Sequence, residues 1–261
     1  MVLINLSKRS KKRNMNEMSS SKTKIMNRNQ IKYLVIVAML IDHIAWAFVP
    51  TSSIPGQVMH FIGRLTGPTM AYFIAEGYAY THNVKRYALR LGIFALISWA
   101  PFVLFEYGTL PVWFVDGEIR WEPSFGVIYT LFLSLLAIWL WDKGKCKRWL
   151  KILGIVGLCI LSVFGDWPVF DVLFALFFFI YKDDTKKKWI AFSGIAFVEV
   201  GFIMLLGGMS QLFQIGVFMI PLLFLFCYNG ESGIKRPIHK WFFYLFYPAH
   251  LLVLGLIRWI L

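Results

Sequence analysis

An aspartate and a histidine stand side by side, Asp42-His43, near the middle of the first long apolar run of the chain, residues 33–50. A run of this length is long enough to cross a lipid bilayer. A charged aspartate at bilayer depth costs roughly 2.5–3.5 kcal/mol on insertion scales, so something must offset that cost. We favour a functional site over the alternative, which is a polar contact that only fixes the packing of two helices.

A second histidine, His250, lies about ten residues into the last apolar run, and therefore at a depth similar to that of His43. Pro248 cannot donate a hydrogen bond to the carbonyl of Tyr244, which predicts a bend near His250. A neutral histidine is the usual general base near pH 7, and either His43 or His250 suits that role. Two other acids at membrane depth, Asp171 and Glu199, are expected to serve structural pairing.

The run over residues 59–80 carries two further charges, Arg64 and Glu76. Arg64 is expected one turn below the outer surface, where it either extends outward to water or acts as a fixed cation at the level of Asp42 and His43. Pro68 leaves the carbonyl of Arg64 without its helical partner. Glu76, one turn from the opposite end of the run, is a further candidate for proton transfer.

Basic residues follow at the turn that ends this run, where His82, Lys85 and Arg86 lead into the next helix and Arg90 lies one turn inside it. These residues satisfy the excess of basic residues that is typical of cytoplasmic loops. They would also offer a cationic mouth to anionic groups in the cytosol.

The composition indicates an integral membrane protein. The chain has 261 residues, of which 58% are hydrophobic and 18% aromatic, more apolar surface than a soluble domain of this size can bury. The net charge of +13 is not distributed in a way that indicates nucleic-acid binding. The three cysteines share no spacing, so neither a disulfide framework nor a metal site is expected.

The chain divides into a basic cytoplasmic tail, residues 1–30, which is too polar to fold alone, and a transmembrane domain, residues 31–261. We expect an all-α, polytopic transmembrane helix bundle of about nine spans in the plasma membrane. The segments around 150–181 are short, so they are either two spans or a re-entrant pair. The expected spans are 33–50, 59–80, 88–106, 124–141, 150–164, 168–181, 189–206, 212–228 and 240–260.

The distribution of basic residues predicts the orientation. With the N-terminus inside and nine crossings, 24 of the 27 lysines and arginines lie in the tail or in inner loops and helix ends. The C-terminus is then outside. No internal repeat is evident, which weakens a transporter interpretation.

Three blocks of sequence together resemble the TraX family of membrane proteins. They are M-L-I-D-H-I in the first span, G-R-L-T-G-P-T-M-A-Y-F-I-A-E-G with T-H-N and R-Y-A-L-R-L after it, and F-F-Y-L-F-Y-P-A-H-L-L at the end. The family is named for a conjugation protein that acetylates the N-terminus of a pilin, and it resembles multi-helix membrane acyltransferases that use cytosolic acyl-coenzyme A. The resemblance marks Asp42, His43, Arg64, Glu76, Arg90 and His250 as motif positions.

The expected function is that of a membrane acetyltransferase that moves an acetyl group from cytosolic acetyl-CoA to an amine or hydroxyl acceptor, with a peptide or protein N-terminus among the candidates. The expected catalytic residues are His43, Asp42, His250, Arg64 and Glu76. The phosphates of coenzyme A are expected at His82, Lys85, Arg86 and Arg90. Membrane lipids and acyl-CoA are the expected partners. The alternatives are a proton-coupled transporter that uses the same residues as a relay, and a non-catalytic scaffold of an export or conjugation machine.

Overall fold

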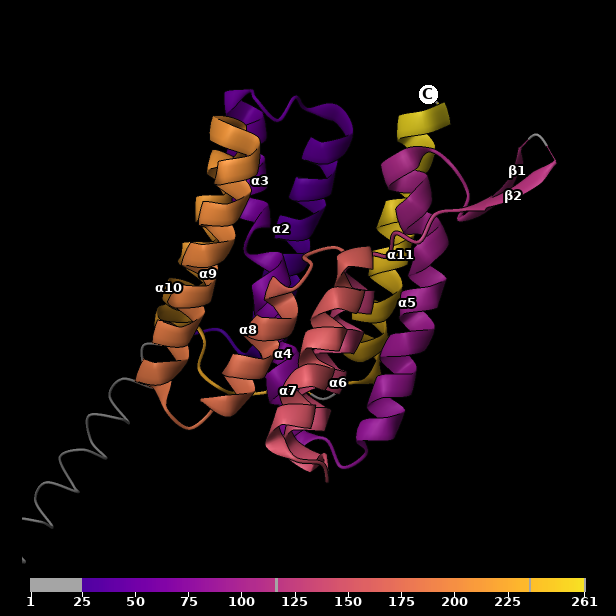
Figure 1. Ribbon diagram of the computed structural model, residues 1–261. Coiled ribbons are helices and arrows are strands. Elements are labelled where there is room, and N and C mark those ends of the chain that lie inside the picture. Colours follow the sequence, from indigo (N-terminus) through magenta and orange to yellow (C-terminus); the bar gives the residue numbers. More distant parts are fainter. Residues whose placement is uncertain (1–24, 116, 235, 261) are drawn as a thin grey trace, which may run out of the picture.

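The computed structural model describes residues 25–115, 117–234 and 236–260, and it is a bundle of helices (Figure 1). Most of the expected tail therefore lies outside the described residues. The first helix of the described residues, α2 (Arg28–Phe48), begins with a reciprocal cap. The side chain of Asn27 accepts a hydrogen bond from the amide of Gln30, and the side chain of Gln30 accepts one from the amide of Asn27. This pair satisfies two of the amides that a helix start leaves free.

The expected second span is two helices rather than one. α3 (Ile54–Gly63) ends at Arg64, and α4 (Thr66–Tyr80) begins two residues later. Pro68 accounts for the break, because a proline in the first turn of α4 has no amide to donate to the carbonyl of Arg64. The break leaves Arg64 at a helix junction inside the bundle.

The longest helices stand beside shorter ones. α5 (Val84–Tyr107) and α11 (Pro237–Ile260) pack along each other over most of their length (Figure 1), and α9 (Thr185–Gly207) packs against the helix that precedes it, α8. α6 (Val127–Lys143), α7 (Arg148–Leu161) and α8 (Phe170–Ile180) fill the lower part of the bundle in that view. A 3-10 turn, η1 (Ser162–Phe164), and a loop join α7 to α8 at about mid-height.

The chain returns beside α9 through irregular helix. Gly208, with φ +65°, ends α9, and η2 (Gly208–Phe218) follows as a 3-10 helix that packs against α3 and α9. α10 (Met219–Leu222) and the π-helical turn η3 (Leu223–Cys227) complete the return. A small hairpin of β1 (Val112–Val115) and β2 (Glu118–Trp121) projects from the loop after α5, which the all-α prediction did not include.

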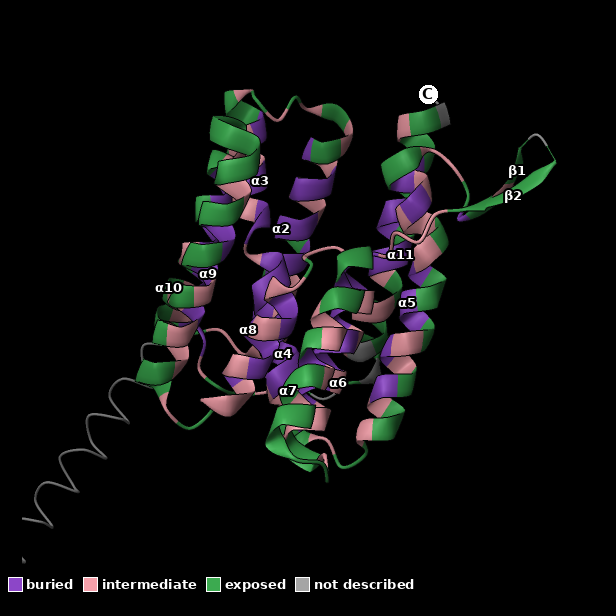
Figure 2. Ribbon diagram, viewed as in Figure 1, coloured by how far each residue is buried: buried purple, intermediate pink, exposed green. Residues whose placement is uncertain are grey.

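The outer surface of the bundle is apolar. Figure 2 shows exposed residues along the outward faces of the long helices, and on α9 these include Phe197, Val198 and Leu205, which are 74%, 61% and 83% exposed. Large apolar side chains on a continuous outward face are typical of contact with lipid. The chain is therefore an all-α membrane protein, as the composition predicted.

The number of crossings stays a prediction. Four helical runs in the described ranges are long and apolar enough to cross a membrane: Arg28–Phe48, Val84–Tyr107, Thr185–Cys227 and Trp241–Trp259. The third run turns back at Gly208 and holds two expected spans. α7 and α8, at about 21 Å and 16 Å, are shorter than the roughly 30 Å hydrocarbon layer, which favours the re-entrant alternative for residues 150–181.

The helix ends that carry most lysines and arginines gather at one end of the bundle, which we call the basic end. It comprises the start of α2, the turn between α4 and α5, the loop between α6 and α7, and the turn between α8 and α9, all low in Figure 1. This clustering agrees with the pattern from which the orientation was predicted, and the orientation itself stays a prediction.

Candidate active site

Asp42 of α2 is held by two partners from the break between α3 and α4. Its Oδ1 accepts a hydrogen bond from Nδ1 of His60 at 2.7 Å, and its Oδ2 accepts one from the guanidinium of Arg64 at 2.9 Å. All three side chains are buried, with Arg64 only 8% exposed. Of the two positions expected for Arg64, the structure therefore shows the fixed cation, and extension to the surface is wrong. Among the described residues, the carboxylate of Asp42 makes no hydrogen bond to His43 that would orient its ring.

The two histidines at membrane depth do meet. Nδ1 of His43 lies 2.8 Å from the carbonyl of Met39, and Nδ1 of His250 lies 2.8 Å from the carbonyl of Phe246. A carbonyl only accepts, so each neutral ring carries its proton on Nδ1. Nε2 of His250 lies 3.3 Å from Nδ1 of His43 and accepts a share of that proton. The remaining ring nitrogen, Nε2 of His43, is left as an unprotonated acceptor.

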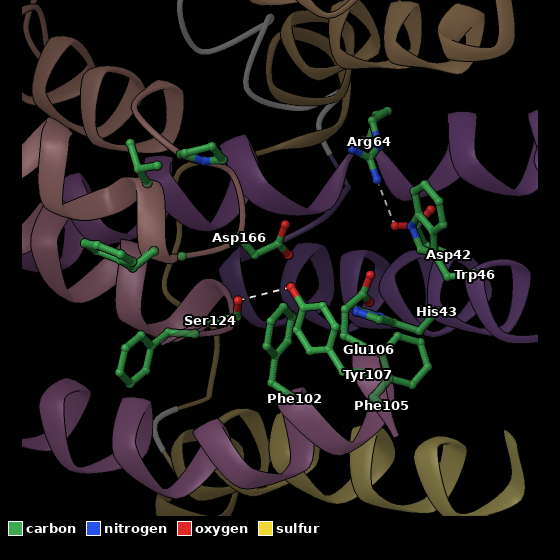
Figure 3. A pocket seen from close by; sticks show the side chains of 15 residues that line it. Asp42, His43, Trp46, Arg64, Phe102, Phe105, Glu106, Tyr107, Ser124 and Asp166 are labelled. Atoms are coloured by element: carbon green, nitrogen blue, oxygen red, sulfur yellow. Dashed lines mark hydrogen bonds and ion pairs between the residues drawn. The ribbon is translucent and has the colours of Figure 1, made fainter. Parts of the chain in front are cut away.

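His43 lines a pocket of about 310 Å³ above the short helices. Figure 3 shows the ring of His43 and the carboxylates of Glu106 and Asp166 gathered around the same space. Tyr107 and Ser124, whose hydroxyl oxygens are 3.1 Å apart, form another part of the wall. The remaining wall is mainly aromatic and apolar, with side chains from α2, α5 and the loops before α6 and α8. The pocket thus combines the imidazole of His43 with three acids, Asp42, Glu106 and Asp166, and with the guanidinium of Arg64, between side chains that are otherwise mainly aromatic.

The loop before α8 delivers Asp166 to this pocket. Its backbone is fixed by hydrogen bonds from the amide of Asp166 to the carbonyl of Phe125 at 2.9 Å and from the hydroxyl of Thr130 to the carbonyl of Asp166 at 2.5 Å. Two bulky residues in the loop, Trp167 and Val169, have φ of 56° and 65°, a region that costs a non-glycine residue roughly 1–3 kcal/mol. Such strain persists where surrounding contacts enforce it.

The side chain of Trp167 makes contacts that hold this loop in place. The guanidinium carbon of Arg64 lies 4.6 Å from the ring centroid of Trp167 and 5.2 Å from the ring centroid of Phe213. The Trp167 ring fits because position 67 is glycine: a Cβ there would lie 2.6 Å from Cδ2 of Trp167. Two aromatic faces and one carboxylate therefore hold the Arg64 cation in a single position.

Glu76 belongs to a different group. Its two carboxylate oxygens accept hydrogen bonds from Nε of Arg28 and from the hydroxyl of Tyr228, both at 2.7 Å. These contacts lie at the basic end, and Glu76 is not among the residues that line the pocket. The structure brings together four of the expected catalytic residues, Asp42, His43, Arg64 and His250, and separates Glu76 from them.

The residues expected to bind coenzyme A lie at the turn between α4 and α5. His82, Lys85 and Arg86 are exposed, and Arg90 is half-buried, with its Nε donating to the hydroxyl of Tyr244 at 3.0 Å. No ion pair holds any of the four among the described residues. They share the basic end with Glu76 and not the pocket with His43.

For Asp171 and Glu199, which were expected to serve structural pairing, no ion pair is present among the described residues. Both are buried, and the carboxylate of Asp171 has no hydrogen-bond partner among the described residues. Throughout the described residues, no group of three or more histidine, cysteine, aspartate and glutamate side chains is arranged so that it could hold a metal ion.

Sequence reasoning missed three residues of the site. His60 precedes Arg64 by four residues, which is one helical turn, so their shared face was a usable signal. Glu106 is the last residue of the expected span 88–106, and Asp166 lies between the expected spans 150–164 and 168–181; neither was among the expected site residues. The structure places both at the pocket, and nothing local in the sequence indicated that they meet.

The family model described as TraX protein matches residues 27–258, which covers the whole bundle and every site residue discussed above. The chain belongs to the TraX family. The resemblance carried by the intramembrane motifs is thereby confirmed.

A curated relative matches the chain over a similar length. The chain is 30% identical over 237 residues to a protein of Dichelobacter nodosus named "Probable fimbrial assembly protein FimC, serogroup H1", and the match covers 86% of this chain and 93% of that protein. No solved structure matches the chain.

Proposed function

We propose that this TraX-family protein is a membrane acetyltransferase that transfers an acetyl group from acetyl-CoA to an amine or hydroxyl acceptor. The observation that carries the proposal is which ring nitrogen of His43 holds the proton. Its Nδ1 proton is committed to the carbonyl of Met39 and to His250, so Nε2 is the basic nitrogen and it belongs to a ring that lines the pocket.

His43 acts as the general base. An amine or hydroxyl that attacks a thioester must lose a proton, and Nε2 of His43 is the group placed to accept it. The ring that becomes charged is stabilised at Nδ1, which donates more strongly to the carbonyl of Met39 and to Nε2 of His250 once the imidazole is protonated. Glu106, at the same pocket, adds a negative charge close to the ring.

Arg64 supplies the fixed positive charge of the site. Asp42 and the rings of Trp167 and Phe213 hold it, so it needs no reorganisation as negative charge develops on an acyl oxygen nearby. Asp42 is then a positioning residue for Arg64, and His60 completes the hydrogen bonding of Asp42.

Acetyl-CoA supplies an activated acyl group as a thioester. The donor set at the basic end suits its phosphates, because His82, Lys85, Arg86 and Arg90 present hydrogen-bond donors and positive charge with no carboxylate bound to them in the described structure. These residues would hold the phosphates on the side of the membrane that the distribution of basic residues assigns to the cytosol.

The acceptor is the less defined partner, and the pocket favours an amine. Glu106 and Asp166 have no ion-pair partner in the described structure, so an ammonium group that enters the pocket gains two carboxylate neighbours. A peptide or protein N-terminus has this chemistry. The relative from Dichelobacter nodosus is named for fimbrial assembly, which agrees with a protein acceptor.

The name of this relative also supports a second candidate function, that of a non-catalytic scaffold in an assembly machine. A scaffold needs neither the unprotonated nitrogen of His43 nor an acetyl donor. Acetyl transfer separates the two. Purified protein in lipid nanodiscs is mixed with acetyl-CoA labelled in the acetyl group and with peptides whose N-terminus is either free or blocked. We expect label in the free peptide only. Absence of both acetylated product and free coenzyme A would favour the scaffold.

A further inference from the structure

A lysine near the start of α2 forms no ion pair within the described part of the chain. Lys32 lies one turn inside the helix and is half-buried, with its ammonium 5.3 Å from the ring centroid of Phe73 and 5.2 Å from that of Phe243. Two aromatic faces attract a cation weakly. No hydrogen bond or ion pair to Lys32 is present among the described residues, so its charge is not neutralised there.

The charges around Lys32 are mostly of the same sign. Arg28, one turn earlier, and Arg90 of α5 both act electrostatically on Lys32. Arg90 approaches from the neighbouring helix, where its guanidinium lies 5.4 Å from the ring centroid of Tyr244. Glu76 is the acid in reach, and both of its oxygens are already used by Arg28 and Tyr228. Three cations thus face one engaged carboxylate.

Like charges held this close at the edge of a membrane repel one another unless an anion enters between them. The three side chains are only half-buried, so a ligand can reach them. Two guanidinium groups and an ammonium together offer the many donors that a phosphate group accepts from.

We propose that Lys32, Arg28 and Arg90, which we call the Lys32 cluster, bind a phosphate group at the basic end of the bundle. Two sources carry this chemistry: a soluble nucleotide, as in coenzyme A, and the head group of an anionic lipid. The first source rests on the proposed function, and the second does not.

The position of Lys32 on α2 links the cluster to the pocket. Lys32 and His43 are 11 residues apart, which is close to three full turns, so both lie on the same face of the helix and about 16 Å apart along its axis. A phosphate bound at Lys32 is therefore aligned with the proposed base.

The test uses the full-length protein in nanodiscs of phosphatidylcholine and two probes. The soluble probe is adenosine 3′,5′-bisphosphate, titrated by calorimetry. The lipid probe is the replacement of 30% of the phosphatidylcholine by phosphatidylglycerol, read as a change in thermal unfolding temperature. We expect wild type to respond to at least one probe, and Lys32→Met to weaken that response by roughly tenfold or more in affinity, or to abolish the temperature shift.

Lys188→Met is the matched control. Lys188 is also a lysine near the basic end, with its ammonium 5.6 Å from the ring centroid of Tyr72, but besides Glu76 it has a second acidic neighbour, Asp183. It should behave as wild type. Lys32→Arg, which keeps the charge, should retain most of the response and shows that loss in Lys32→Met is not misfolding.

The outcomes are distinct. A response to the bisphosphate assigns the soluble source, and a response to phosphatidylglycerol alone assigns the lipid. A wild type that responds to neither probe, or a Lys32→Met variant that equals wild type, overturns the proposal. Phosphate binding without acetyl transfer would leave the Lys32 cluster in place and remove the proposed function.

Discussion

Single residues in the pocket differ in how their charge is balanced. Asp42 has a partner on each oxygen, whereas Glu106, an acid at the same pocket, has no ion-pair partner in the described structure. Arg64 depends on Asp42, since its other polar contact, to Gln214, is long at 3.5 Å. Two acids at one pocket thus have different roles, and substitution separates them.

Asp42→Asn should be strongly destabilising. Removing the charge leaves the Arg64 cation buried without a counter-ion, and breaking a buried pair from one side costs roughly 3–5 kcal/mol. Glu106→Gln, which removes a pocket carboxylate that pairs with no cation in the described structure, is the control and should change stability by less than about 1 kcal/mol. Thermal unfolding in detergent measures both. Equal stability of the two variants would mean that Asp42 does not hold Arg64.

At the scale of elements, the strained loop before α8 and the start of α4 depend on each other. Trp167 fits against α4 because Gly67 has no side chain, and the ring in turn covers Arg64. The position of α8 therefore affects the Arg64 cation, because the loop before α8 carries the Trp167 ring that covers it.

Gly67→Ala should destabilise the protein by roughly 1–3 kcal/mol and lower activity, because the new methyl group displaces Trp167 from Arg64. Gly201→Ala on α9 is the matched control. A Cβ at Gly201 meets nothing within 4 Å, so alanine there should be neutral or stabilising by up to about 1 kcal/mol. If both alanine variants unfold at the wild-type temperature, the close approach of Trp167 is not what Gly67 provides.

The start of α9 carries a pH-dependent cap. The carboxylate of Asp184 accepts a hydrogen bond from the amide of Lys187 at 2.9 Å, and this backbone hydrogen bond lowers the pKa of Asp184 below its ordinary value. A lowered pKa means that the folded state favours the ionised form. The cap therefore stabilises the fold at neutral pH, and its contribution is lost as the pH falls below about 3.9 and through the folded pKa.

Asp184→Ala should thus lower the unfolding temperature at pH 7, with the difference from wild type shrinking as the pH approaches 3. Asp183→Ala removes a neighbouring carboxylate that does not cap the helix, and it should show no such pH dependence. A difference between Asp184→Ala and wild type that stays constant from pH 7 to pH 3 would contradict the capping role.

For the whole molecule, local patterns predicted the fold better than the site. Apolar runs place most helices, because each run satisfies its own backbone and needs no partner to be recognised. The pair Asp42–Arg64 was foreseeable only as an alternative, since adjacent residues on a helix point about 100° apart and the partner helix was unknown. The two histidines were expected at a similar depth, but their contact was not predicted. Glu106 and Asp166 meet at the pocket through contacts between distant segments, for which the sequence offers no local signal.

Sidedness can be tested on the intact molecule. An engineered cysteine at Asp116, which lies outside the described residues, should react with a membrane-impermeant maleimide added to whole cells, and one at Lys186 should not. The native Cys146 is exposed in the loop between α6 and α7 at the basic end, so it should react only after permeabilisation. Labelling of Lys186→Cys or Cys146 in sealed cells would reverse the orientation.

The central claim is that His43 is the base of an acetyl transfer, and the most direct measurement is the rate of transfer from acetyl-CoA to a peptide amine by His43→Ala in nanodiscs. The rate should fall by roughly 10²–10⁴, while His250→Ala, which removes only a hydrogen-bond acceptor of His43, loses on the order of tenfold. His239→Ala, a histidine on α11 at the basic end, should match wild type. Near-normal transfer by a folded His43→Ala variant would contradict the account.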